Sequence, residues 1–334
     1  MIPGPKYDVA IAGAGLIGLT LALELHARGA SVAIFDIAKA AQQASAAAAG
    51  MLAAHDPNAP HNPPALRALS AYSLSLYPDL LRRIESLSGL PVPIQTTSTL
   101  QYLDDGSTHR LAEDSLDPRQ LAAAVLEAVH RLNIPIHEDT GPIEIEETPT
   151  SVSIHPFHGP DLLAGLLVHA TGAWFQGPPR IIPRKGQMLR VQIPPRLTLA
   201  EVHRSSAVYI VPRTHGPRAG SALIGATDED TGFDLHVSQP ALDDLRARAA
   251  RLLPALASLD DAPQLEAWAG LRPATADGLP LLGPLPGSSR QWAATGHYRN
   301  GILLAPATAV ALADRLDAKS PAIDLKPFAP ARFF

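Results

Sequence analysis

The sequence predicts an α/β fold that begins with a parallel sheet. The prediction rests on two strands, a glycine-rich turn and a helix near the N-terminus. Tyr7 to Ala12 is an apolar run with the length of a buried strand. It ends at the turn Gly13-Ala14-Gly15-Leu16-Ile17-Gly18, and Leu19 to Arg28 then shows the apolar spacing of a helix. A second strand, Ser31 to Phe35, ends at Asp36. Strand, glycine turn, helix, strand and acid together form a Rossmann-type dinucleotide fingerprint.

Each part of this fingerprint has a physical role. The glycines allow a tight turn and a close backbone approach, and the N-terminus of the following helix offers unpaired N–H groups to a pyrophosphate. Asp36 can accept hydrogen bonds from ribose hydroxyls, and an acid at this position favours a ribose without a 2′-phosphate.

The alanine-rich segment Ala44 to Leu52 has two readings. Alanine is a strong helix former, and small side chains also let a flat ring system approach the backbone closely. Composition does not choose between them. Residues 57–64 are rich in proline and asparagine and predict a loop, after which Ala65 to Leu87 has a helical pattern. Asp117-Pro118 predicts the start of another helix, running to about Leu132.

The middle of the chain returns to strands. Ile143 to Ile154 alternates as one or two antiparallel strands would. Leu166 to Ala170 predicts a buried strand that runs into Thr171-Gly172-Ala173-Trp174, a turn suited to packing against a bound nucleotide.

Most of a second, substrate-facing domain is predicted between Pro183 and Pro263. It contains three strand-like runs and one helix, at Gln187 to Ile193, Val208 to Val211, Ala222 to Ala226 and Ala241 to Leu253. Glycine-rich turns are predicted beyond it, at Trp268 to Pro273, Asp277 to Pro280 and Gly296 to Ile302. The last of these enters a helix that ends at Leu316.

Composition excludes several classes of function. The chain has 334 residues and a net charge of −5 from scattered charges, so no nucleic-acid partner is expected. It has no cysteine, which excludes thiolate chemistry and a thioether-linked flavin. Glycines interrupt the apolar run Val9 to Leu25, and no stretch reaches the length of a membrane span, so a cytoplasmic protein without a membrane partner is expected. The histidines, including His55 and His61, lack ligand spacing, so no metal is expected.

Seven separated motifs then carry a resemblance. They are Gly13 to Gly18 with Asp36, Ser45 to His55, Ala170 to Trp174, Tyr209 to Arg213, Gly225 to Thr227, Trp268 to Pro273 and Gly296 to Thr308. In this order they resemble the D-amino-acid oxidase-like FAD-dependent flavoproteins, and within them the glycine oxidases of thiamine biosynthesis. The resemblance implies a doubly wound, glutathione-reductase-like FAD domain made of 1–90, 114–182 and 264–334. An antiparallel-sheet substrate domain, 91–113 and 183–263, is inserted in it.

The resemblance also implies roles for residues. Non-covalent FAD is expected to contact Gly13, Ala14, Gly15, Leu16, Ile17, Gly18, Asp36, Ala44, Ser45, Gly50, Met51, Thr171, Gly172, Trp174, Gly296, His297, Tyr298, Arg299, Asn300, Gly301 and Ile302. The start of the last helix is expected near the flavin pyrimidine oxygen. Arg272 is expected to clamp a substrate carboxylate, with Tyr209 adding a hydroxyl and Arg299 lining the pocket. An interdomain salt bridge for Arg272 and a core position for Tyr209 are the structural alternatives.

The expected reaction is hydride transfer from a small amino acid or amine to flavin, with O₂ as acceptor and hydrogen peroxide as product. Two alternatives stay open: a D-amino-acid or secondary-amine dehydrogenase with another acceptor, and a catalytically silent FAD-binding subunit. A homo-oligomer is compatible with each of these functions. The chain departs from the family pattern at Ala207, where a histidine is frequent, and at Gln43, where an arginine is frequent.

Overall fold

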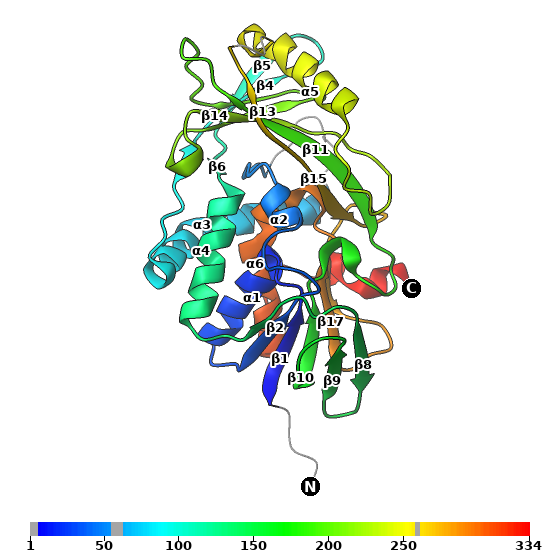
Figure 1. Cartoon of the computed structure of the whole chain (residues 1–334). Helices are drawn as coiled ribbons and strands as arrows, with labels where there is room; N and C mark the ends of the chain where they lie inside the picture. Colours follow the sequence, from blue (N-terminus) through cyan, green and yellow to red (C-terminus); the bar gives the residue numbers. More distant parts are fainter. Residues whose placement is uncertain (1–5, 55–62, 258–260) are drawn as a thin grey trace.

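The computed structural model describes residues 6–54, 63–257 and 261–334, and it contains two large sheets (Figure 1). The first sheet has the order β16-β17-β10-β1-β2-β7, with β9 and β8 added on β10. Its strands are β1 (Tyr7–Ala12), β2 (Val32–Phe35), β7 (Ile136–His137), β8 (Ile143–Glu147), β9 (Val152–Pro156), β10 (Leu162–His169), β16 (Leu281–Pro284) and β17 (Gln291–Thr295). β1 pairs in parallel with β2 and β10, which confirms the α/β fold predicted from the glycine turn.

Four helices cover one face of this sheet (Figure 1): α1 (Leu16–Ala27), α3 (Pro64–Ser88), α4 (Pro118–Arg131) and α6 (Gly301–Leu316). Leu19, Leu21, Leu23 and Leu25 are all buried, because α1 packs on the sheet with one side and on α6 with another. The predicted start of α4 is confirmed, since the Asp117 carboxylate accepts a hydrogen bond from the Arg119 N–H at 2.9 Å. The loop predicted at 57–64 lies almost entirely outside the described residues.

The second sheet lies above the first in Figure 1 and has the order β15-β11-β14-β13-β12-β4-β5. Its strands are β4 (Thr99–Tyr102), β5 (Thr108–Leu111), β11 (Ile182–Gln192), β12 (Val202–Arg204), β13 (Tyr209–Arg213), β14 (Ser221–Gly225) and β15 (Gln264–Ala274). Helix α5 (Gln239–Leu252) packs on its outer face through Leu242, Leu245 and Ala249. A small sheet of β3 (Ile94–Thr96) and β6 (Ser115–Leu116) joins the two parts. All neighbouring strands of the large sheet are antiparallel except β12 and β4.

Trp268 to Pro273 was predicted as a glycine-rich turn, and this is wrong. The segment lies inside β15, which pairs with β11 from Ile182 to Val191. Gly270 serves a close approach instead of a turn, because a Cβ there would stand 2.4 Å from the Cβ of Ala47. The sheet therefore extends past the predicted domain boundary at residue 264, and the division of the chain into two domains stays a prediction.

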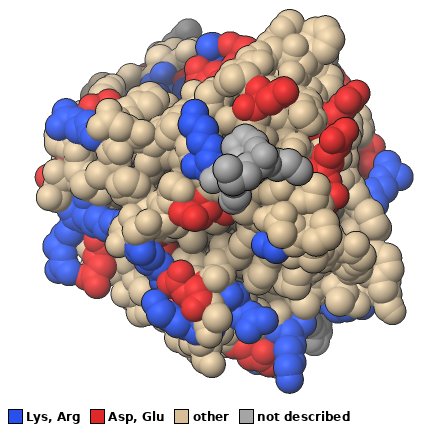
Figure 2. Space-filling model, turned by 90° about the horizontal axis from the view of Figure 1, so that it is seen from below, with Lys and Arg blue, Asp and Glu red and all other residues tan. Residues whose placement is uncertain are grey.

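The alanine-rich segment forms only one helical turn, α2 (Ala44–Ala47), and is extended from Ala48. α2 lies between the two sheets (Figure 1). Across the residues that the structure describes, no helix is both long and apolar enough to cross a membrane. Basic and acidic side chains are interspersed on the face seen from below in Figure 2.

Candidate functional site

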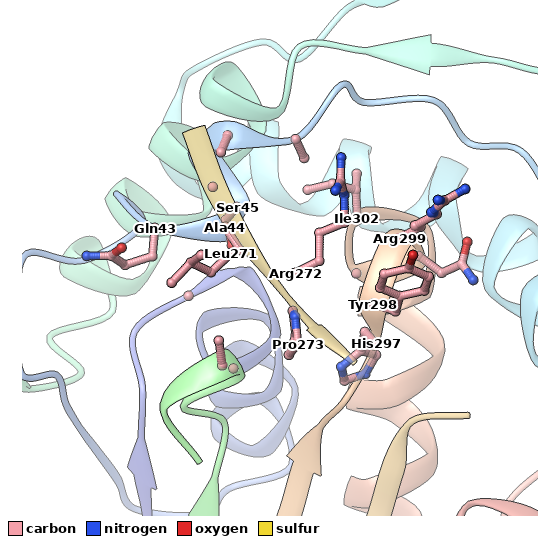
Figure 3. A pocket seen from close by; sticks show the side chains of 18 of the residues that line it. Gln43, Ala44, Ser45, Leu271, Arg272, Pro273, His297, Tyr298, Arg299 and Ile302 are labelled. Carbon is pink, nitrogen blue, oxygen red and sulfur yellow. The ribbon is translucent and has the colours of Figure 1, made fainter. Parts of the chain in front are cut away.

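One cavity of about 930 Å³ lies between the two sheets and collects most of the predicted site residues. They are Gly13, Gly15, Leu16, Ile17, Asp36, Ala44, Ser45, Gly50, Met51, Thr171, Gly172, Trp174, Tyr209, Arg272, His297, Tyr298, Arg299, Asn300, Gly301 and Ile302. Ala14, Gly18 and Gly296 belong to the predicted set but do not line it. In Figure 3, Gln43 lies on one side of β15, and Tyr298 and Arg299 lie on the other.

The glycines of the first turn serve two purposes. Gly13 has φ +106°, and a Cβ there would stand 2.4 Å from the Ala170 carbonyl oxygen. A Cβ on Gly18 would stand 2.0 Å from the Gly13 carbonyl oxygen. These two glycines allow protein to pack on protein. Gly15 is different, because a Cβ would meet only Ser45 Oγ, at 3.5 Å, and would project from the cavity wall.

The N-terminus of α1 faces the cavity with its positive end, and its own first turn carries no side chain that neutralises it. Gly15 is the N-cap and provides no side-chain cap, and the first turn has no acidic residue. Ser45 Oγ accepts a hydrogen bond from the Leu16 N–H at 2.9 Å, which ties α2 to the start of α1. A helix end of this kind favours an anion such as a pyrophosphate.

Asp36 lines the same cavity. Its two carboxylate oxygens accept hydrogen bonds from the N–H groups of Ala14 at 2.7 Å and Ala38 at 2.9 Å. Burial raises the pKa of Asp36, and these two hydrogen bonds oppose that rise. Each oxygen keeps a second lone pair, so the side chain can still accept from a ribose hydroxyl.

The stretch from Ala46 to Ala49, which ends α2 and continues past it, is fixed by side chains that were not predicted as site residues. Three of its carbonyl oxygens accept hydrogen bonds, at Ala46 from Arg119 (3.1 Å), at Ala47 from Trp268 (3.2 Å) and at Ala49 from Arg213 (2.9 Å). Arg119 also stacks on the Trp268 ring at 4.6 Å. The segment therefore forms a rigid stretch of small residues along the cavity wall.

Arg272 and Tyr209 line the cavity from strands β15 and β13 of the second sheet. Arg272 Nη1 donates to the Thr227 carbonyl oxygen at 3.1 Å, and its guanidinium lies so close over Gly186 that a Cβ there would meet it at 2.3 Å. The Tyr209 hydroxyl donates to Met188 Sδ at 3.1 Å. A thioether is a weak acceptor, so this hydroxyl can turn to a stronger one. Burial raises the pKa of Tyr209, which keeps the hydroxyl protonated as a donor.

The start of α6 brings a third group of residues to the cavity. Buried His297 shares a hydrogen bond between Nε2 and Thr308 Oγ1 at 3.0 Å. Tyr298 has φ +48°, an uncommon conformation for an aromatic residue. Its hydroxyl donates to Asp228, and Arg299 donates to the same carboxylate at 2.7 Å. Asp228 was not predicted as a site residue, since nothing in the sequence pairs it with residues 70 positions later.

His297 is expected to make the protein sensitive to acid. Burial lowers the pKa of His297 from 6.5 to about 3, so the unfolded state takes up a proton first as the pH falls. The stability is complete above pH 6.5 and is lost as the pH falls towards 3, by at most about 1.4 kcal/mol for each pH unit. Between pH 7 and pH 5, at saturating FAD, we expect the Tm of His297→Gln to fall less than the Tm of the wild type. The exposed His109→Gln is the control, and equal slopes for all three proteins would contradict the expectation.

The part of the chain that the structure covers contains no group of three or more His, Asp or Glu side chains arranged to hold a metal ion. His55 and His61 lie outside the described residues. A glycine turn of the dinucleotide-binding type and a guanidinium line one cavity, which is typical of a dinucleotide-dependent enzyme.

Comparison with known proteins narrows this class. The family model described as FAD dependent oxidoreductase (DAO) matches residues 8–115 and 105–315. Glycine oxidase from Geobacillus kaustophilus is 31% identical over 98% of this chain and 97% of its own. The bifunctional protein ThiO/ThiG of Trichormus variabilis is 36% identical over 92% of this chain and 52% of its own. The crystal structure of the Geobacillus kaustophilus glycine oxidase superposes with a TM-score of 0.89 at 28% identity, covering 98% of this chain and 99% of that one.

The chain belongs to this family of FAD-dependent oxidoreductases. The cavity fits FAD, because it offers an anion-binding helix end beside Gly15, an acceptor at Asp36 and a wall of small residues from Ala47 to Met51. The positions of the individual contacts to FAD stay predictions.

Proposed function

We propose that this chain oxidises glycine or another small amino acid or amine, with FAD as cofactor and O₂ as acceptor. The observation that carries the proposal is that Arg272 and Tyr209 line the same cavity as Gly15 and Asp36. The relatives named glycine oxidase support it, since they match this chain over nearly its whole length. A homo-oligomer, a cytoplasmic location and a role in thiamine biosynthesis are compatible with it.

The residues divide the work of binding and orientation. When bound, FAD supplies a hydride acceptor that dioxygen reoxidises, with hydrogen peroxide as product. Arg272 binds the substrate carboxylate, and the Tyr209 hydroxyl leaves Met188 to donate to the same group. Together they fix the orientation of the substrate Cα. The N-terminus of α6, with no acidic residue in its first turn, stabilises negative charge near it.

One departure from the family pattern enlarges the substrate end, and a second removes a charge elsewhere in the cavity. Ala207 lines the cavity, where its methyl group replaces the imidazole frequent in glycine oxidases. Gln43 lines it as a neutral side chain. Substrates with one additional methyl group, such as sarcosine or D-alanine, therefore belong to the proposed class.

Anaerobic mixing of the purified holoprotein with glycine, sarcosine, D-alanine or D-proline tests the proposal. We expect bleaching of the flavin absorbance by glycine or by another small amino acid of this set, and hydrogen peroxide in equal amount when air is readmitted. Bleaching without peroxide formation would show that the enzyme is a dehydrogenase and not an oxidase. A flavin that none of the four compounds bleaches would refute the proposed substrate class.

A further inference from the structure

Asp228 is the centre of a polar network at the rim of the cavity. Its Oδ2 accepts hydrogen bonds from Arg299 at 2.7 Å and from the Tyr298 hydroxyl, and its Oδ1 accepts from Arg184 at 2.9 Å. Burial alone would raise the pKa of Asp228, but the hydrogen bonds from Tyr298, Arg299 and Arg184 lower it to about 2. The carboxylate is therefore ionised whenever the enzyme is folded and active.

The charges of this network are matched in pairs. Arg184 has a second carboxylate, Asp230, at 3.7 Å, so Asp228 is available to neutralise Arg299. Arg299 also lies over the Tyr298 ring, 5.1 Å from its centroid. Both contacts hold the guanidinium at the rim, where the Arg299 side chain is 56% exposed.

Arg272 differs from Arg299 although both line the cavity (Figure 3). Its side chain contacts neutral groups, the Thr227 carbonyl oxygen and Tyr209, and in residues 6–54, 63–257 and 261–334 no carboxylate lies within 4.0 Å of it. Asp228 and Arg184 do not line the cavity, so they act on it only through Tyr298 and Arg299. The substrate end thus offers one positive charge without a carboxylate partner.

We propose that Asp228 is a positioning residue that neutralises Arg299 and so restricts the enzyme to substrates with a single carboxylate. This rests on the proposed function, because it assigns the substrate carboxylate to Arg272. A second carboxylate on the substrate would have to compete with Asp228 for Arg299. Amino monocarboxylates such as glycine or sarcosine are accepted, and amino dicarboxylates are disfavoured.

Ligand binding without turnover tests this inference. Acetate and malonate, a monocarboxylate and a dicarboxylate that the enzyme does not oxidise, are titrated into the holoprotein while the flavin spectrum is recorded. In Asp228→Asn we expect the Kd of malonate to fall about tenfold, as for one new charge-assisted hydrogen bond, with the Kd of acetate changed less than about twofold. Asparagine keeps an acceptor for Tyr298, so the start of α6 retains its anchor.

Three further variants separate specificity from general damage. In Asp228→Asn/Arg299→Met the gain for malonate should disappear, because the freed guanidinium is absent. In Arg184→Met the ratio of the two Kd values should stay as in the wild type, because Asp228 still holds Arg299. Arg299→Met leaves Asp228 with only Arg184, which it shares with Asp230, so the binding of malonate should weaken more than that of acetate even if Asp228→Asn does not fold.

An unchanged ratio in Asp228→Asn, or a gain that persists in the double variant, would overturn the inference. Equal effects of Arg299→Met on both ligands would overturn it as well. The Kd values of acetate and malonate are read from the spectrum of the bound flavin and require no turnover. They are therefore independent of the bleaching experiment with glycine, which tests the proposed function separately.

Discussion

Arg272→Met is expected to retain FAD and to lose about a thousandfold in kcat/KM with glycine. The guanidinium comes from β15 of the second sheet, whereas the α1 turn belongs to the first sheet, so its removal should leave the predicted nucleotide contacts intact. Two charge-assisted hydrogen bonds to a carboxylate, each worth about 2 kcal/mol, account for this loss. Steady-state peroxide formation gives the rate, and the absorbance ratio of protein to flavin gives the FAD content.

Two other substitutions sharpen this test. Arg272→Lys keeps the charge but not the planar fork, so it should recover only part of the lost activity. Arg184 is the direct cross-strand partner of Arg272 between β11 and β15 but does not line the cavity. Arg184→Met therefore removes an equal charge nearby and should keep glycine turnover. Loss of FAD in Arg272→Met, or equal losses in both methionine variants, would contradict the assignment of the clamp.

The sequence predicted the nucleotide-binding part of the fold because its signals are local. Gly13 to Gly18, the strand before them and Asp36 all lie within one β-α-β unit, and Gly13, Gly15 and Asp36 line the cavity. The predicted start of α4 depends on Asp117 and Pro118, which act on their own helix. Such signals need no knowledge of the tertiary structure.

The sequence failed where a residue's role depends on a distant partner. Gly270 looked like a turn residue, but it is needed because Ala47 packs against β15. The short α2 is ended by tertiary contacts that override the helix propensity of alanine, since Trp268 and Arg213 hold carbonyl oxygens of this segment. Asp228 carries no motif, and its role appears only when β14 and α6 bring it to Arg299.

Gly15→Val is expected to give a folded protein that has lost FAD. Gly15 has φ −75°, which valine adopts without strain, and a Cβ there meets only Ser45 Oγ, at 3.5 Å. The added isopropyl group would occupy cavity space beside the N-terminus of α1, where the pyrophosphate is expected. Overpacking of about 3 kcal/mol would weaken FAD binding about a hundredfold. Flavin fluorescence after desalting gives the retained FAD, and thermal unfolding reports the fold.

Gly18→Val separates cofactor loss from fold loss. Its Cβ would stand 2.0 Å from the Gly13 carbonyl oxygen, inside the protein, so this variant should lose thermal stability together with FAD. Gly15→Val should unfold near the temperature of the wild-type apoprotein. If Gly15→Val kept stoichiometric FAD, the open side of Gly15 would not face the cofactor. The anion would then have to bind away from the start of α1. That outcome would be unexpected, because among Gly13, Gly15 and Gly18 only a Cβ on Gly15 would avoid a clash with protein atoms and project into the cavity.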